Sequence, residues 1–220
     1  IMFPSTNMYY LTNNQKDAVK AELAQDYLQA GLYDRAEELF TTLTSKRYRQ
    51  AALFSLLEIY VREREWLQAV ETATGLERLS GTPFRKEIAQ YHCELAMNAM
   101  IDQQPDQVRF HLANAIDANK KCVRANVLLG DLEIQSGSHA AAISHWKHIE
   151  FQDPEYLVLI APKLLQSYTA LHKSKEGIAL LKSYLDNYKL PSLMSALYES
   201  TLAVEGAGSA ATLARKELIR

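Results

Sequence analysis

Apolar residues recur at intervals of three and four along most of the chain, which is the spacing of one face of an α-helix. The strict alternation of apolar and polar residues that marks a half-buried strand is absent. The eight glycines and six prolines fall mostly between the periodic segments. The pattern therefore predicts long helices joined by short turns, and no β-sheet.

One set of offsets repeats along the chain. From Ala24 it places Tyr27 at +3, Ala36 at +12 and Phe40 at +16, with Gly31 in the turn between. The same offsets start again from four further anchors, which are between 33 and 39 residues apart: Leu57, Ala96, Gly130 and Leu165. We interpret each set as one pair of antiparallel helices.

Close packing of two helices explains these offsets. Positions 0 and +3 share one face of the first helix, and +12 lies on the second helix where the two axes come closest. Only a small side chain fits there, as at Ala36, Ala69, Ala142 and Gly177. A larger residue at +16 fills the space that opens one turn later.

Helix pairs that recur at about 34 residues are the signature of tetratricopeptide repeats. We predict an all-α fold, a tetratricopeptide superhelix or α-solenoid, with five recognisable repeats and a partial sixth. We expect a poorly patterned segment over residues 1–16, five repeats over 17–190, and a partial or capping repeat over 191–220. The last segment is either a cap or the start of a longer array.

Glycine and proline predict where several helices end. Ser80-Gly81-Thr82-Pro83 predicts a helix stop, then a helix with Thr82 as N-cap and Pro83 in its first position. Pro105 is expected to open the second helix of the third repeat. Pro162 lies where the first helix of the fifth repeat should already be under way, so that helix is expected either to start late or to be kinked.

Composition and charge exclude several classes of function. With 24 basic and 26 acidic residues, the chain lacks the positive field that attracts nucleic acid or anionic lipid. Its two cysteines fit neither a disulfide framework nor paired metal-ligand spacing, which favours a reducing compartment. No apolar run reaches the roughly 18 residues that a membrane span needs, and Ile1–Tyr10 lacks the features of a signal peptide.

Candidate chemistry is sparse. His145 and His148 lie three residues apart, with His139 nearby, but their offsets face away from the repeat core and no carboxylate or thiol joins them at ligand spacing. We therefore expect a solvated face, no metal site and no cofactor in this chain. No segment supplies a nucleophile with an oriented base, so we expect no enzyme activity. Buried packing is the expected role of Cys93, Cys122, Tyr27, Tyr60, Tyr168, Trp66 and Trp146.

The first helices of such repeats build a concave groove that binds other proteins. The groove offsets have polar residues at the two ends of the array and apolar residues in the middle, which suits an amphipathic helix or an extended peptide. Leu28, Val61, Cys93, Ile134 and Thr169 also fall on these offsets. The residues that we predict to bind a partner, called here the predicted groove wall, are Gln25, Gln29, Phe54, Glu58, Arg62, Met97, Met100, Ile101, Arg124, Asp131, Gln135 and Gln166.

Two segments resemble a known family. Ala30-Gly31-Leu32-Tyr33-Asp34-Arg35-Ala36-Glu37 and Tyr91-His92-Cys93-Glu94-Leu95-Ala96, in this order and spacing, are similar to the bacterial lipopolysaccharide assembly protein B family. The similarity runs from about Ala21 to about Arg220. Members of that family are tetratricopeptide proteins of Gram-negative bacteria, with a membrane helix ahead of the repeats and a zinc ribbon with paired CxxC motifs behind them. Neither segment is present in this sequence.

The resemblance implies an adaptor on the cytoplasmic face of the inner membrane. Its implied role is to bring the deacetylase of the lipid A pathway within reach of an ATP-dependent membrane protease. Zinc would then belong to the missing C-terminal ribbon, and a homodimer is compatible with the repeats. Two alternatives stay open: a peptide-binding scaffold for secretion or pilus assembly, and the non-catalytic repeat part of a glycosyltransferase.

Overall fold

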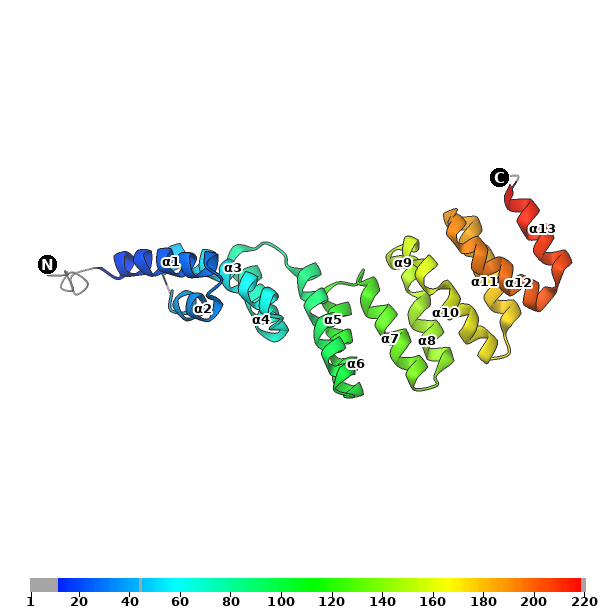
Figure 1. The fold of residues 1–220 in the computed structure, drawn as a ribbon, viewed down its shortest axis with the longest axis horizontal. Coiled ribbons are helices and arrows are strands. Elements are labelled where there is room, and N and C mark those ends of the chain that lie inside the picture. Colours follow the sequence, from blue (N-terminus) through cyan, green and yellow to red (C-terminus); the bar gives the residue numbers. More distant parts are fainter. Residues whose placement is uncertain (1–11, 44, 219–220) are drawn as a thin grey trace. The chain divides into compact units, whose positions relative to one another are not determined.

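The computed structural model describes residues 12–43 and 45–218 (Figure 1). Of the segment 1–16 that we expect to be poorly patterned, residues 1–11 lie outside these ranges. The chain forms two compact units, residues 1–98 and residues 99–220.

The first unit consists of two helical hairpins and most of a fifth helix (Figure 1). Each hairpin turns within a few residues, and Gly31 in the first turn has a φ of 74°, which favours glycine. The third helix packs against both helices of the preceding hairpin. The helices are α1 (Asn13–Gln29), α2 (Tyr33–Thr41), α3 (Lys46–Glu63), α4 (Trp66–Ser80) and α5 (Arg85–Ile101), of which α5 continues past the unit boundary.

The second unit continues the same pattern and adds three short elements. Its buried side chains form one core that joins α8, α10, α11, α12 and α13. The elements are α6 (Pro105–Ala118), α7 (Val123–Gln135), α8 (His139–Lys147), α9 (Ile149–Gln152), the 3₁₀ helix η2 (Pro154–Tyr156), α10 (Leu157–Ala170), α11 (Ser174–Tyr188), the 3₁₀ helix η3 (Pro191–Leu193), α12 (Met194–Glu205) and α13 (Ala207–Leu218).

The predicted fold class is confirmed. The described residues form helices and no strand, and every predicted repeat corresponds to two consecutive long helices. The fold is therefore an all-α tetratricopeptide solenoid.

Contacts within the hairpins agree with the predicted offsets. Ala36 and Ala142, both at +12, are fully buried. A Cβ atom added to Gly177, also at +12, would lie 2.9 Å from the Cβ atom of Tyr168 at +3. In the fourth repeat, a Cβ atom on Gly130 would lie 2.0 Å from the Nε1 atom of Trp146 at +16. The small residues are therefore required by the close approach of the helices.

Two of the predicted helix boundaries are correct. Gly81 caps α4 with a φ of 71°, in the left-handed region, and Pro105 is the first residue of α6. The predicted start of the next helix is wrong, because α5 begins at Arg85. The Thr82 backbone N–H donates to the Ser80 hydroxyl, a local turn that keeps Thr82 and Pro83 outside the helix.

The structure of the fifth repeat tests the expectation that its first helix starts late. Helix α10 begins at Leu157, so Pro162 lies inside it and the expectation of a late start is wrong. Proline has no N–H to bond the carbonyl of Val158 one turn earlier. Just before α10, the short helices α9 and η2 form an insertion that the two-helix pattern did not predict. Gln152 holds this insertion in place by donating to the carbonyls of Lys120 and Cys122.

Candidate functional site

None of the twelve residues of the predicted groove wall is buried. Nine are exposed, and Met100, Arg124 and Asp131 are half-buried. Two other residues on the same offsets, Leu28 and Cys93, are buried: the wall position is wrong for Leu28, whereas Cys93 was also expected to pack in the core and does so. Each lies three or four residues from the repeat anchor and thus shares the core face of its helix. The role of the twelve in binding stays a prediction.

In the first unit, α1 and α3 carry the wall residues of the first two repeats. Gln25 and Gln29 are exposed on α1. On α3, the ring of Phe54 is 44% exposed, and its centroid lies 6.0 Å from that of Phe84. The contact with Phe84 fixes one side of the Phe54 ring, so this aromatic side chain is held in place while part of it faces solvent.

Arg62 is held by two partners on its own unit. Its Nη2 atom lies 2.7 Å from the Glu58 carboxylate, and its Nη1 atom donates to the Tyr33 hydroxyl at 3.1 Å. The hydrogen bonds to Tyr33 and Glu58 raise the pKa of Arg62 above its usual value. Glu58 and Arg62 therefore neutralise one another, which reduces the net charge of this stretch of wall.

In the second unit, Asp131 of α7 is engaged by a residue that the sequence did not single out. The ammonium of Lys163 on α10 lies 2.6 and 2.8 Å from the two carboxylate oxygens of Asp131. It also lies 5.9 Å from the ring centroid of Trp146. The pair links the first helices of two successive repeats. Gln135 and Gln166, on the same two helices, stay exposed.

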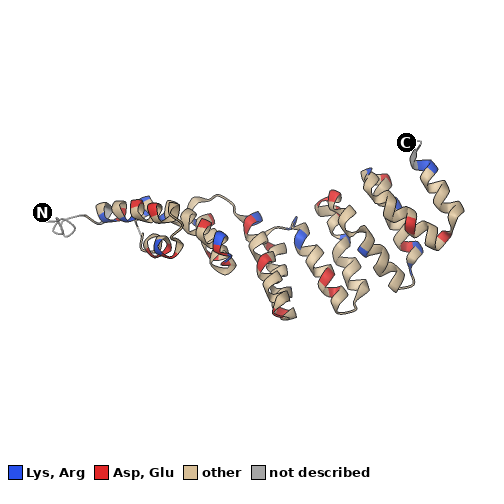
Figure 2. Cartoon of the chain, viewed as in Figure 1, with Lys and Arg blue, Asp and Glu red and all other residues tan. Residues whose placement is uncertain are grey.

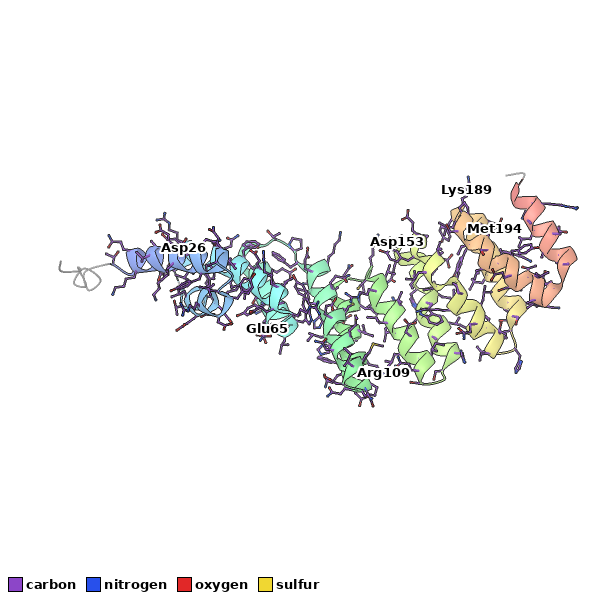
Figure 3. All side chains as sticks on the ribbon, viewed as in Figure 1. Asp26, Glu65, Arg109, Asp153, Lys189 and Met194 are labelled. Atoms are coloured by element: carbon purple, nitrogen blue, oxygen red, sulfur yellow. The ribbon has the colours of Figure 1, made fainter. Side chains whose placement is uncertain are left out.

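A second ion pair joins α6 to α7. Arg109, labelled in Figure 3, pairs with Glu133, whose side chain is 8% exposed. Glu133 occupies the +3 offset, a core position where a carboxylate needs a partner. The Nδ1 atom of His139 on α8 lies 3.2 Å from the Ser167 hydroxyl on α10. These polar contacts connect different helices of the second unit.

The apolar centre of the predicted wall lies on α5. Met97, Met100 and Ile101 occupy positions i, i+3 and i+4, which share one face of a helix. Ile101 is the most exposed of the three at 78%. An isoleucine that is largely exposed to water on a regular helix is a candidate anchor for a partner.

The histidines do not form a metal site in the described part of the chain. His148, the C-cap of α8, has its Nδ1 atom 2.8 Å from the carbonyl oxygen of Ser144 in that helix. His145 is half-buried, so the prediction that it faces solvent is wrong. Burial lowers the pKa of His145 below its usual value. Within residues 12–43 and 45–218, no three His, Cys, Asp or Glu side chains converge as metal ligands would.

The remaining predicted packing residues differ in burial. Cys93 and Cys122 are buried thiols, and Tyr60 and Trp146 are buried as predicted. The other three aromatic residues, which were also expected to serve packing, are half-buried. Trp66 stacks on Tyr91 with centroids 6.0 Å apart, which leaves part of its ring at the surface. The half-buried residues are Tyr27, Trp66 and Tyr168.

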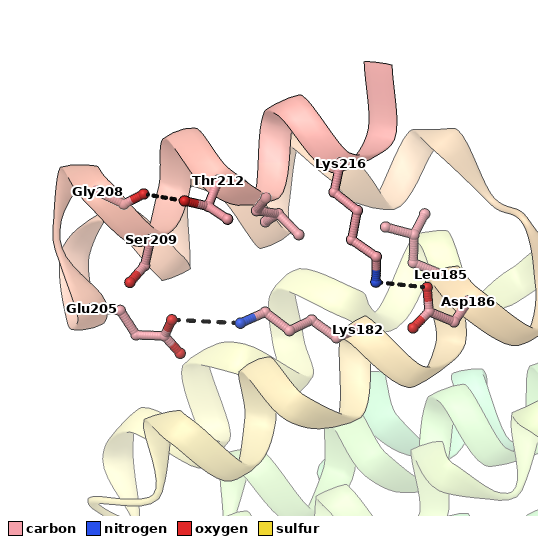
Figure 4. A pocket seen from close by; sticks show the side chains of 9 residues that line it. Lys182, Leu185, Asp186, Glu205, Gly208, Ser209, Thr212 and Lys216 are labelled. Atoms are coloured by element: carbon pink, nitrogen blue, oxygen red, sulfur yellow. Dashed lines mark hydrogen bonds and ion pairs between the residues drawn. The ribbon is translucent and has the colours of Figure 1, made fainter. Parts of the chain in front are cut away.

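A pocket of about 450 Å³ lies among α11, α12 and α13 in the second unit (Figure 4). Lys182 faces Glu205 at 3.5 Å, and Lys216 faces Asp186 at 3.8 Å. Each lysine that lines the pocket is thus matched by a carboxylate. The pocket brings together neither a nucleophile with a base nor a metal-ligand set.

The distribution of charge and the hydropathy of the helices are the last two properties of the surface. Acidic and basic residues are interspersed along the helices of both units (Figure 2). Among the helices that the structure describes, none combines the length and the apolar content needed to cross a bilayer.

Sequence comparison gives four significant curated relatives with one name. Lipopolysaccharide assembly protein B of Escherichia coli strain K12 is 33% identical over 173 residues, which cover 78% of this chain and 44% of the relative. The Haemophilus influenzae protein of the same name is 30% identical over 180 residues, covering 81% and 42%. The chain therefore spans less than half the length of these relatives. No protein-family model matches it.

Comparison with solved structures gives matches of low sequence identity. A crystal structure of MamA has a TM-score of 0.48 and 16% identity, covering 88% of this chain and 98% of that one. A crystal structure of YrrB, described as a TPR protein with an unusual peptide-binding site, has a TM-score of 0.44 and 15% identity, covering 80% and 89%.

The curated relatives confirm the resemblance that the two sequence segments indicated. The helical hairpins, the small residues at +12 and this sequence relationship agree with one another. The chain is an all-α tetratricopeptide-repeat scaffold that is related in sequence to lipopolysaccharide assembly protein B.

Proposed function

We propose that this chain is the adaptor region of a regulator of lipopolysaccharide synthesis, and that it holds the deacetylase of the lipid A pathway close to an ATP-dependent membrane protease. The observation that carries this proposal is the sequence relationship with lipopolysaccharide assembly protein B over 78% of the chain. In this role the chain binds proteins and catalyses no reaction.

Within each unit, the side chains of the predicted groove wall support protein binding. Regular helices hold its side chains, so a partner meets a surface with little conformational freedom left to lose. In the first unit Phe54 provides an exposed apolar anchor. In the second unit Ile101 is an exposed apolar anchor, and Gln135 and Gln166 provide amide donors and acceptors. Buried apolar anchors usually contribute most of the energy of an interface, and the polar residues around them exclude water.

We assign the membrane helix and the zinc ribbon of this family to sequence outside the 220 residues. The curated relatives are more than twice as long as the matched region, which is enough for such segments. In this proposal the repeats lie on the cytoplasmic face of the inner membrane and need no metal of their own.

The proposal is tested by co-purification. The whole chain, tagged and expressed in a Gram-negative host, is expected to capture both the deacetylase and the protease. Alanine at Met97, Met100 and Ile101 together should reduce capture at least tenfold, because it removes the apolar anchors of α5. The matched control is alanine at Leu67, Phe110 and Phe151, which are exposed apolar residues outside the predicted wall.

Two outcomes would contradict the proposal. If the unmodified chain captures neither protein, the adaptor function is wrong. If the α5 variant keeps its helicity and captures both proteins at the original yield, the partners bind elsewhere. Loss of helicity in that variant would mean that the three residues stabilise the fold, so alanine at Ile101 alone, which is 78% exposed, provides the check.

A further inference from the structure

A groove runs between α3 and α4 in the first unit, with a volume of about 440 Å³. It lies near the start of α3 and the end of α4, because the two helices are antiparallel. None of the twelve residues of the predicted groove wall lines it. The lining residues are Arg49, Leu53, Glu71, Thr72, Gly75, Arg78 and Leu79.

No contact within the first unit explains why residue 75 is a glycine. It lies in the interior of α4, has no positive φ, and a Cβ atom added to it would have no heavy atom within 4 Å. Neither backbone conformation nor internal packing therefore requires a glycine. A glycine inside a helix is unfavourable relative to alanine, but it allows another molecule to approach the backbone closely.

Two arginines flank this bare stretch of helix. Arg49 of α3 and Arg78 of α4 are both exposed, and neither guanidinium group makes a hydrogen bond, ion pair or ring contact with any residue that the structure describes. The first turn of α3 carries Lys46 and Arg47 and no acidic residue. The positive end of the helix dipole adds to these charges. Glu71 is the one carboxylate among the lining residues.

Apolar surface completes the groove. Leu79 is 46% exposed and Leu53 is partly buried. The arginines therefore border an apolar strip whose exposure to water is unfavourable. A partner that fits this surface presents apolar side chains on one face and carboxylates along its edges. An amphipathic helix has that pattern, since its residues at i, i+3 and i+4 share one face.

We propose that the α3–α4 groove binds an acidic amphipathic helix of a partner protein. Carboxylates of that helix pair with Arg49 and Arg78, its apolar face covers Leu53 and Leu79, and its closest residue lies against Gly75. Guanidinium groups suit this task because they bind carboxylates in a two-pronged geometry. The proposal does not depend on the adaptor function.

The first test uses the whole chain and two labelled peptides in fluorescence anisotropy. One is an amphipathic helical peptide with leucines on one face and flanking glutamates, and the other has lysine in place of each glutamate. The glutamate peptide should bind, with an affinity that falls as salt is added, and the lysine peptide should not. Changing Arg49→Glu and Arg78→Glu together should weaken binding at least tenfold.

A matched charge control separates the groove from a general field effect. Lys175→Glu with Arg215→Glu makes the same change in net charge on exposed residues of the second unit, and should leave the affinity within about twofold. Equal losses in both double variants would overturn the proposal. Equal binding of the two peptides would also overturn it.

The second test fills the groove without changing charge. Gly75→Leu should lower affinity for the glutamate peptide at least tenfold, while the melting temperature stays the same or rises, because leucine favours helix and has open space. Gly208→Leu, at another helical glycine with open space, is the control and should bind normally. Unchanged binding by a folded Gly75→Leu variant would contradict the proposal.

Anionic lipid is the other ligand with suitable charge. Vesicles that contain phosphatidylglycerol are therefore included in both tests. Binding to these vesicles that is lost in the Arg49 and Arg78 variant, together with no binding of the glutamate peptide, would overturn the proposal in favour of a membrane surface. The outcomes of the peptide and vesicle experiments are independent of the capture of the deacetylase through α5.

Discussion

Gly130 lies directly against the indole ring of Trp146 in the fourth repeat. A Cβ atom there would lie 2.0 Å from the indole Nε1 atom, which donates to the carbonyl of Val127 at 3.3 Å. Trp146 is buried, so its ring cannot move aside without disturbing the core. We expect Gly130→Ala to reduce the free energy of unfolding by roughly 1–3 kcal/mol, measured by urea denaturation.

Gly75→Ala is the matched control for this prediction. Both glycines are helical, but Gly75 has open space around it. The free energy of unfolding should therefore rise by up to about 1 kcal/mol, the difference in helix propensity. If both substitutions change stability in the same direction, helix propensity rather than contact with Trp146 determines the effect.

His145 should make stability depend on pH. Burial lowers its pKa, an effect that His148 and Arg109 reinforce and Glu133 opposes. The unfolded chain therefore takes up a proton near pH 6.5, where the folded chain still does not. Stability should fall as the pH drops from about 7 through 6.5. His145→Gln should lose less stability over this range than the unmodified protein in thermal melts.

Burial also lowers the pKa of His111, so part of the slope of melting temperature against pH should remain when His145 is replaced. An unaltered slope in His145→Gln would show that this histidine does not contribute.

Two ion pairs that connect helices of the second unit should contribute unequally to the free energy of unfolding. The carboxylate of Glu133 is buried, whereas both members of the Lys163–Asp131 pair are about a third exposed. Arg109→Ala leaves a buried charge without its partner, so we expect the free energy of unfolding to fall by about 2–3 kcal/mol. This is less than for a fully buried pair, because the side chain of Arg109 is half-exposed. Lys163→Ala should cost about 1 kcal/mol or less.

A second substitution tests the reason for this difference. Adding Glu133→Gln to the Arg109→Ala variant removes the unpaired charge and should recover part of the lost stability, measured by urea denaturation. If the double variant is as unstable as the sum of the two single variants, the arginine stabilises the fold through its aliphatic stem and not through the ion pair.

At the scale of the whole molecule, the helices α1–α4 of the first unit and α6–α13 of the second pack mainly on helices that are near them in sequence. Stacked repeats of this kind derive their stability from neighbouring hairpins and need no metal to fold. We expect the chelator EDTA to leave the melting temperature unchanged. A lower melting temperature in EDTA, restored by added zinc, would contradict this expectation and support the histidines of α8 as metal ligands.

The sequence alone was sufficient to predict the repeat architecture. Helical periodicity and the small residues at +12 are local or nearly local features, because two antiparallel helices joined by a short turn must meet at a fixed distance along the chain. This is why Ala36, Ala142 and Gly177 were found at the close approaches of their hairpins. The exposure of all twelve predicted wall residues to at least some degree follows from the same periodicity.

The tertiary structure decided which side chains meet across different helices. Periodicity assigns a face to a residue, but Leu28 and Cys93 lie close enough to the core face to be buried. The partnership of Lys163 with Asp131 joins residues 32 positions apart on two helices, and no spacing in the sequence marks it. Likewise, the unpaired arginines and the bare Gly75 form a groove only because α3 and α4 are antiparallel. Contacts between helices depend on interaxial distance and rotamer, which the periodicity of a single helix does not contain.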